Sequence, residues 1–271
     1  MAKQALDLRQ ARVLLTGATG GIGQAIAHNL ADAGAQLLLC GRDEKALRTL
    51  RLALPRLASG REHQCVVADI TDPAAQQAVE AAAQALGGIT HLINNAGISQ
   101  FDMVADQDFA SQLNINLLAP MQLCQRLLPQ LQAQPAAVIV NVGSAFGSIG
   151  YPGFSGYCAS KFGLRGFTEA LARELGNSRV QVHYFAPRAT QTSINSPEVV
   201  AMNQALGNAM DDPQWVAAQL RQQLLQAQRR RFLGWPEQIF VRLNALFPSL
   251  VDAALQSKLG IITQFAKAKQ L

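Results

Sequence analysis

The chain has 271 residues and a mass of 29.1 kDa, and 49% of its residues are hydrophobic, which suits one large α/β domain. Its net charge is +5, but the basic residues form no dense stripe beyond Arg229, Arg230 and Arg231, so we expect no nucleic-acid partner. The four histidines are scattered and the four cysteines form no C-x-x-C pair, so we expect no metal site.

The amino-terminal segment predicts a nucleotide site. Residues 11–15 form an apolar run typical of a buried parallel strand, residues 16–23 read TGATGGIG, and helical spacing follows from residue 24. Gly17 permits the tight turn, Gly21 lets the backbone approach a pyrophosphate, and Gly23 allows close helix packing. The alternative is a plain glycine-rich turn. The expected nucleotide contacts here are Gly17, Thr19, Gly21, Ile22 and Gly23.

The end of the second predicted strand bears on the choice of nucleotide. Residues 36–40 are followed by Gly41 and Arg42, where an NAD site usually has a carboxylate for the ribose. A guanidinium attracts a 2′-phosphate, so Arg42 predicts NADP(H), and Thr19 adds a hydroxyl to the same phosphate. Two alternatives stay open: Asp43 reaches the ribose, or Arg42 only caps the next helix.

Two further strands end in residues that suit the adenosine half of the nucleotide. Residues 66–70 close with Asp69, a candidate acceptor for the adenine amino group, and Ile70, which is expected to pack on the ring. Residues 91–93 run into Asn95, Ala96 and Gly97. The two small residues leave room for adenosine, and Asn95 is expected mainly to brace the strands.

Tyr157 and Lys161 lie four residues apart, which places both side chains on one face of a helix. A free phenol has a pKa of about 10, and a neighbouring ammonium favours its ionised form. Ser144 follows an apolar run that resembles a strand, and its hydroxyl is expected to hold an oxygen next to the phenol. Taken alone, the pair also fits an aromatic residue on a core face beside a solvated lysine.

In combination these motifs resemble the short-chain dehydrogenase/reductase family over about residues 10–192. They are TGxxxGxG at 16–23, NNAG at 94–97, NINL at 114–117, Ser144, and YxxxK at 157–161. The resemblance implies that Tyr157 is the general acid/base and that Ser144 positions the reacting oxygen. It implies that Lys161 binds the nicotinamide ribose and lowers the Tyr157 pKa, and that Asn116 helps to hold a proton-relaying water. Hydride transfer itself belongs to the nicotinamide.

The same resemblance places Pro187 and Thr192 at the carboxamide end of the nicotinamide. Arg188 departs from the family, which commonly has glycine after this proline. Two interpretations stay open, in which Arg188 attracts an anionic substrate group or pairs with an acidic side chain at the surface. Strands and helices alternate from residue 11 to about 186, which predicts a Rossmann-type, doubly wound parallel sheet in one domain.

The last part of the chain governs the substrate. We expect a domain over residues 1–235, with a mobile substrate lid at about 193–212 (or a surface loop without a role), and a helical extension over 236–271. The extension is apolar on one face. It packs over the domain or a partner subunit, walls a hydrophobic substrate tunnel, or dips into a membrane surface.

The sequence therefore predicts an NADP(H)-dependent oxidoreductase that interconverts a carbonyl and an alcohol on a small hydrophobic substrate. The alternatives are a 3-oxoacyl-thioester reductase and a catalytically silent nucleotide-sensing protein. The resemblance implies a homodimer or homotetramer. Buried free cysteines, and the lack of a signal peptide or an apolar run approaching about 18 residues, predict a cytoplasmic protein, with peripheral membrane contact through the extension left open.

Overall fold

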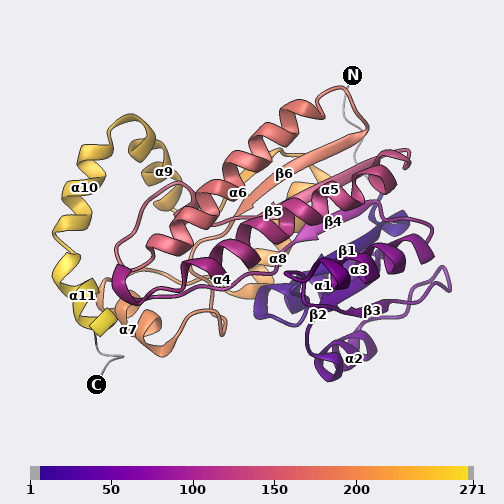
Figure 1. The fold of residues 1–271 in the computed structure, drawn as a ribbon, viewed down its shortest axis with the longest axis horizontal. Helices are drawn as coiled ribbons and strands as arrows, with labels where there is room; N and C mark the ends of the chain where they lie inside the picture. Colours follow the sequence, from indigo (N-terminus) through magenta and orange to yellow (C-terminus); the bar gives the residue numbers. More distant parts are fainter. Residues whose placement is uncertain (1–6, 268–271) are drawn as a thin grey trace.

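Seven parallel strands form one sheet in the order β3-β2-β1-β4-β5-β6-β7 (Figure 1). The structure, a computed structural model, describes residues 7–267. The order reverses between β1 and β4, as in Rossmann-type folds, so the predicted fold class is confirmed. The strands are β1 (Arg12–Thr16), β2 (Gln36–Gly41), β3 (Gln64–Val67), β4 (His91–Asn94), β5 (Ala137–Val142), β6 (Val180–Ala186) and β7 (Arg230–Phe232).

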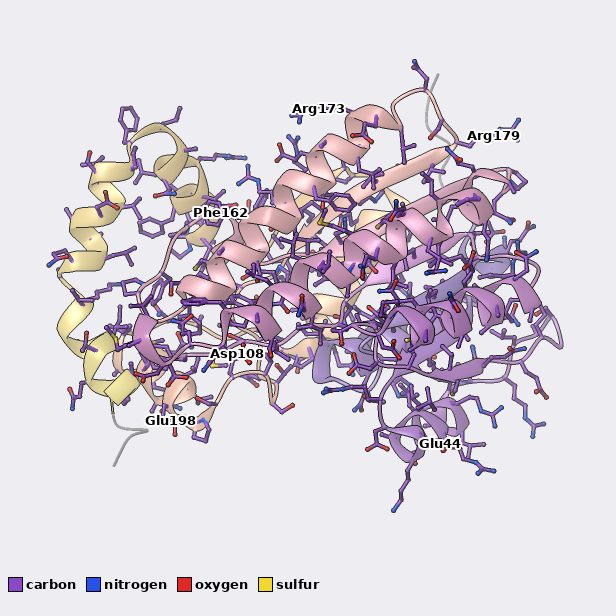
Figure 2. The ribbon with its side chains drawn as sticks, viewed as in Figure 1. Glu44, Asp108, Phe162, Arg173, Arg179 and Glu198 are labelled. Carbon is purple, nitrogen blue, oxygen red and sulfur yellow. The ribbon has the colours of Figure 1, made fainter. Side chains whose placement is uncertain are left out.

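Helices cover both faces of the sheet, because consecutive apolar strand residues point to opposite sides. Val13 and Leu15 belong to the core on one face, whereas Leu14 belongs to the core on the other. The first face packs on α1 (Gly21–Asp32), α2 (Glu44–Ala53) and α8 (Pro213–Leu225). The second packs on α3 (Pro73–Ala85), α5 (Ala119–Gln132) and α6 (Ser155–Glu174). Charged side chains such as Glu44 and Arg173 lie outside these layers (Figure 2).

Aspartates fix where several helices begin. The carboxylates of Asp43, Asp72 and Asp212 accept from backbone N–H groups of the first turns of α2, α3 and α8. Proline occupies the first turn of α3 and of α8, where its missing N–H costs no helical hydrogen bond. The Asp43 Oδ1 accepts from the Ala46 N–H at 2.9 Å, so this carboxylate serves as the cap of α2.

The segment between β4 and β5 does not follow one regular helix. It contains α4 (Phe109–Leu113), then a π-helix, η3 (Asn114–Leu118), and then α5. Such π segments are rare and occur frequently at functional sites. Short 3₁₀ turns lie before β1, between β4 and α4, and after β5; they are η1 (Leu8–Gln10), η2 (Val104–Asp106) and η4 (Ala145–Gly147).

The carboxyl-terminal part is more ordered than the sequence predicts. The expected lid at 193–212 contains a helix, α7 (Pro197–Ala205), which Ser196 caps. After β7, the chain forms a separate arm of three helices at the end of the molecule that carries α7 (Figure 1). They are α9 (Glu237–Leu246), α10 (Pro248–Gln256) and α11 (Leu259–Lys267); the last four residues of the predicted extension lie outside the described residues.

Apolar contacts and a hydrogen bond attach the arm to the domain. Ile262 of α11 packs with Met202 of α7, and Val241 and Val251 pack with Ile149. The Asn244 side chain donates a hydrogen bond of 2.9 Å to the backbone oxygen of Ser148. Within residues 7–267, no helix combines the length and the apolar character that crossing a membrane requires.

Candidate active site

One cavity of about 960 Å³ opens at the carboxyl ends of the strands, where the strand order reverses. The glycine turn after β1 lines one end of it, and residues of α7, α9 and α10 line the other. Ser144, Tyr157 and Lys161 lie on its wall between these ends. The cavity therefore brings together the two motifs that the sequence places more than a hundred residues apart.

The phenol and the ammonium of the Tyr157–Lys161 pair are neighbours on α6, as their spacing predicts. The Lys161 Nζ lies 5.7 Å from the centroid of the Tyr157 ring, and it donates a hydrogen bond of 3.0 Å to the backbone oxygen of Val142. Ser144 begins η4, where its Oγ accepts from the backbone N–H of Phe146 at 3.1 Å. These bonds fix the donors of the site before a substrate arrives.

Burial shifts the pKa of both groups in the site. It raises the pKa of Tyr157 to about 12, and the Ser144 hydroxyl acts in the opposite direction. It lowers the pKa of Lys161 to about 8, because a buried ammonium loses its hydration. Burial is thus the largest influence on the Tyr157 pKa, and the lowering by Lys161 that the resemblance implies stays a prediction.

Asn116 lies in the π-helix, behind the cavity wall. Its side-chain amide donates to the Ile98 oxygen at 2.9 Å and to the Ser160 Oγ at 3.0 Å, and its Oδ1 accepts from the Ile98 N–H at 2.9 Å. The side chain is 1% exposed and thus joins the loop after β4 to α6. Its role in holding a relaying water stays a prediction.

Two further residues support the site, and motif reasoning missed both. The Tyr184 side chain is fully buried on β6 beneath Gly143, where an added Cβ would lie 2.2 Å from its ring. Its hydroxyl donates to the Ser144 backbone oxygen at 3.3 Å. The Ser160 Oγ donates to the Tyr157 backbone oxygen at 2.8 Å while accepting from Asn116. In the sequence, the only sign that a bulky side chain packs beneath Ser144 is the glycine directly before it, Gly143.

The glycine turn has the geometry that a pyrophosphate site needs. Gly17 has φ +62°, and an added Cβ there would lie 2.7 Å from the Ala96 Cα. An added Cβ on Gly23 would lie 2.1 Å from the Gly17 oxygen, so only glycine permits this close packing of α1. Gly20, at the helix N-cap, offers no side-chain acceptor, so the N–H groups of the first turn are left for an anion.

The remaining predicted nucleotide contacts lie around the same cavity. Asn95 donates to the backbone oxygens of Thr16 and Gly17, both at 3.1 Å, which is the bracing role expected for it. The Asp69 Oδ1 accepts from the N–H and hydroxyl of Thr71, and these bonds, followed more weakly by Arg42, hold its pKa below the usual range. The other members of this set that line the cavity are Thr19, Ile22, Arg42, Ile70, Ala96, Gly97, Pro187 and Thr192.

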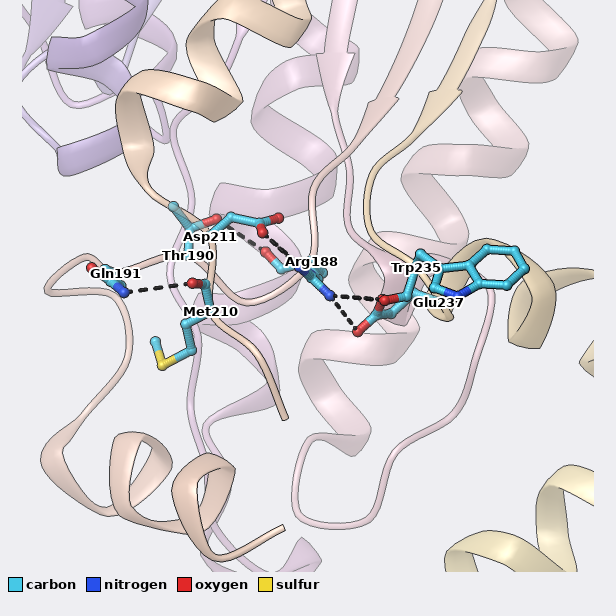
Figure 3. Close-up of polar contacts among 7 residues, drawn as sticks. All are labelled: Arg188, Thr190, Gln191, Met210, Asp211, Trp235 and Glu237. Atoms are coloured by element: carbon cyan, nitrogen blue, oxygen red, sulfur yellow. Dashed lines mark hydrogen bonds and ion pairs between the residues drawn. The ribbon is translucent and has the colours of Figure 1, made fainter. Parts of the chain in front are cut away.

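Arg188 has acidic partners on two sides (Figure 3). Its guanidinium donates to the Asp211 Oδ1 at 2.8 and 3.0 Å and to the Glu237 Oε2 at 3.1 Å. It also reaches the backbone oxygen of Trp235 at 3.3 Å. Its side chain is 17% exposed, so it links the lid to the arm as a largely buried ion pair. Of the two interpretations, pairing with acidic side chains is the one observed.

Comparison with known proteins identifies the family. The family model described as short chain dehydrogenase matches residues 11–202. Over 201 residues the chain is 36% identical to "Dehydrogenase/reductase SDR family member 7B" of Mus musculus, covering 72% of this chain and 62% of that protein. It is 33% identical over 205 residues to "3-oxoacyl-[acyl-carrier-protein] reductase FabG" of Pseudomonas aeruginosa, covering 74% of this chain and 82% of that one.

Solved structures agree with this assignment. A short-chain dehydrogenase/reductase from Burkholderia phymatum in complex with NAD has a TM-score of 0.80, 25% identity, and coverage of 90% of this chain and 96% of that one. A short-chain dehydrogenase from Burkholderia cenocepacia in complex with NADP has a TM-score of 0.72, 30% identity, and coverage of 81% and 92%. The chain belongs to the short-chain dehydrogenase/reductase family, whose members are oxidoreductases of CH–OH and C=O groups.

Proposed function

We propose that this protein is an NADP(H)-dependent oxidoreductase that interconverts a carbonyl and an alcohol on a hydrophobic substrate. The observation that carries the proposal is the single cavity that joins Ser144, Tyr157 and Lys161 to the glycine turn. When bound, the nicotinamide supplies or accepts the hydride. The Ser144 hydroxyl holds the substrate oxygen, and the Tyr157 hydroxyl donates its proton in reduction and takes it back in oxidation. Lys161 binds the nicotinamide ribose.

The preference for a hydrophobic substrate follows from the walls of the cavity beyond Tyr157. Phe146, Tyr151 and Phe154 form a cluster of aromatic rings with Tyr157, with centroids 4.7 to 6.4 Å apart. The predicted lid and the arm add further apolar side chains to the lining of the cavity, and those of α7 pack with the aromatic cluster. The added side chains are Val199, Met202, Leu206, Phe240, Val251 and Leu255. Such walls favour an apolar ligand over a sugar.

The preference for NADP(H) rests on Arg42. This residue lines the cavity just beyond the end of β2, and its guanidinium has no hydrogen bond within residues 7–267. We expect Arg42→Ala to weaken NADPH binding about tenfold to a hundredfold and to leave NADH binding nearly unchanged, because only the 2′-phosphate is lost as a partner. Fluorescence titration with both nucleotides measures this. Equal effects on the two would contradict the assignment.

Replacement of the catalytic phenol tests the function directly. Tyr157→Phe keeps the ring and removes the proton donor, so we expect turnover of a hydrophobic ketone to fall about a hundredfold or more. Nucleotide affinity is expected to change little. A nucleotide-sensing protein without catalysis, the alternative of another class, predicts no turnover in the unchanged protein either. A steady-state assay of both proteins, paired with nucleotide titration, separates the two functions.

A second candidate within the same chemistry is the reduction of 3-oxoacyl thioesters. The relative from Pseudomonas aeruginosa named above favours it. Arg188, which the sequence offered as a cation for an anionic substrate group, is engaged by Asp211 and Glu237 and does not support this candidate. Comparing kcat/KM for a 3-oxoacyl thioester with that for a simple ketone of the same chain length decides between the two substrates.

We also propose a homodimer or homotetramer in the cytoplasm. Phe109, Leu113, Leu118 and Phe162 are 38% to 45% exposed on α4, η3 and α6, and Phe162 projects outward from α6 (Figure 2). The four cysteines are all free, as a reducing compartment would keep them.

Peripheral membrane contact has separate support, since Leu246, Phe247 and Leu250 of the arm are 56% to 72% exposed. Sedimentation and vesicle flotation test these two proposals.

A further inference from the structure

The charged side chains around the cavity differ in how they are engaged. Six of them line it: Arg42, Asp69, Lys161, Arg188, Glu237 and Lys258. Arg42 and Asp69 lie at the end assigned to adenosine. Lys161 donates to Val142, and Arg188 pairs with Glu237 and Asp211. The Arg42 guanidinium has no hydrogen bond but lowers the pKa of the neighbouring Asp69. Among the described residues, the Lys258 ammonium has neither a hydrogen bond nor an ion pair.

Lys258 stands in an apolar part of the wall. It precedes α11, and its backbone is fixed by hydrogen bonds, since its N–H donates to the Leu255 oxygen and its oxygen accepts from the Ile262 N–H. The apolar residues that precede it in the chain and also line the cavity are Val251, Ala254 and Leu255 of α10. The lysine is half-buried. A cation in apolar surroundings gains from an anion more than one in water, because fewer solvent dipoles compete for it.

We propose that the substrate is an amphiphile with an anionic group, a carboxylate or a phosphate, which Lys258 binds at the far end of the apolar part of the cavity. This inference rests on the proposed function. The carbonyl lies between Ser144 and Tyr157, the apolar body runs along the aromatic cluster and α10, and the anion ends at the arm. Lys258 then selects the substrate without taking part in proton or hydride transfer.

The sequence pointed to Arg188 as the cation for such a group. The structure gives Arg188 two carboxylate partners, which leave it little net attraction for a third anion. Lys258 has no such competitor within residues 7–267. The family model ends at residue 202, so this cation belongs to a part of the chain that the family pattern does not describe.

The test uses a series of straight-chain oxo-acids, from medium to long, with the ketone at the end remote from the carboxylate. Each is compared with its methyl ester and with the phosphate ester of the corresponding oxo-alcohol. We expect the full-length enzyme to have a KM at least about tenfold lower for the anions than for the neutral ester, with one chain length preferred. Whether carboxylate or phosphate binds more tightly identifies the natural head group.

Variants of Lys258 show whether its charge, rather than the shape of its side chain, determines the KM of anionic substrates. Lys258→Gln is expected to raise the KM of the anionic substrates about tenfold, to leave kcat in place, and to leave the esters unaffected; Lys258→Glu is expected to raise it further. Arg242→Gln, an exposed cation of α9 that does not line the cavity, serves as the matched control and is expected to change neither class. Equal KM values for acid and ester in the unchanged enzyme, or equal effects of Lys258→Gln on both, would overturn the proposal.

Calorimetric binding keeps the two proposals apart. If no ketone turns over, the proposed function fails, and Lys258-dependent binding of the oxo-acid to the protein with NADP⁺ still supports the anion site. If ketones turn over while oxo-acids bind no better than esters, the proposed function stands and the anion site is refuted. Loss of binding in Lys258→Gln without loss in Arg242→Gln supports the site in either case.

Discussion

Gly97 gives space to two residues of the site at once. An added Cβ there would lie 2.8 Å from the Asn116 Oδ1 and 3.6 Å from the Lys161 Nζ. Gly97→Ala is therefore expected to displace the Asn116 side chain and to crowd the ammonium. Because a shift of about 1 Å in a catalytic group costs up to a hundredfold in rate, we expect kcat to fall tenfold to a hundredfold, as steady-state kinetics would measure.

The chain offers a control for this substitution. Gly166 lies exposed on α6 with no atom within 4 Å of an added Cβ, so Gly166→Ala is expected to leave kcat unchanged and to stabilise the helix by about 0.5–1 kcal/mol. Thermal unfolding of both variants shows whether Gly97→Ala remains folded. A Gly97→Ala enzyme with unchanged kcat would show that this close contact does not set the geometry of the site.

At the scale of elements, Arg188 holds the lid and the arm together. Its partner Asp211 is 9% exposed and forms a parallel β-bridge with Thr190, so the ion pair closes a loop that contains α7. Arg188→Gly restores the residue common in the family and leaves the Asp211 and Glu237 carboxylates without their cation. We expect a loss of about 2 kcal/mol of local stability and faster hydrogen exchange in residues 189–211 and 237–246.

An exposed ion pair provides the comparison for Arg188. Arg173 is 71% exposed and pairs with Glu169 at 3.5 Å, so Arg173→Gly on α6 is expected to show no faster exchange in the lid. We expect substrate KM to rise in Arg188→Gly, because the α7 and α9 walls lose their common anchor. Unchanged exchange in both segments would mean that apolar packing of α11 on α7 suffices to hold the lid.

At the scale of the molecule, a buried histidine makes the stability of the fold depend on pH. Burial lowers the pKa of His91, on β4, from 6.5 to about 4, with His183 adding to the effect. In the unfolded chain the His91 ring binds a proton below pH 6.5, whereas in the folded chain it stays unprotonated down to about pH 4. Stability is therefore full above pH 6.5 and falls by about 3 kcal/mol as the pH drops to 4.

Urea unfolding at several pH values measures this loss. His91→Gln removes the titrating ring, and we expect its stability to depend less steeply on pH between 6.5 and 4, even if its absolute stability is lower. The half-buried His63, whose pKa burial also lowers, contributes in the same direction and leaves part of the slope. Equal slopes in both proteins would show that His91 is not the group responsible.

Periodicity and motif spacing predicted the sheet, the glycine turn, and the meeting of Tyr157 with Ser144, because these depend on local patterns. Other features depend on contacts between distant segments. The π-helix around Asn116 leaves no mark in composition, and the support of Ser144 by Tyr184 requires β5 and β6 to be paired. The burial that raises the Tyr157 pKa could not be predicted from the neighbouring lysine, because it depends on segments distant in the sequence.

Part of the far wall of the cavity comes from α9 and α10, which follow the whole sheet in the chain. Residues 11–235 contain every strand of the sheet and the whole Ser144–Tyr157–Lys161 set, whereas α9, α10 and α11 follow them in synthesis. Because chains generally fold from the amino end as they emerge, the nucleotide half can take shape before its substrate chamber is complete. A nascent chain paused before α9 would then be competent to hold coenzyme and would have the aromatic cluster and α7, but would lack the part of the substrate wall that α9 and α10 supply.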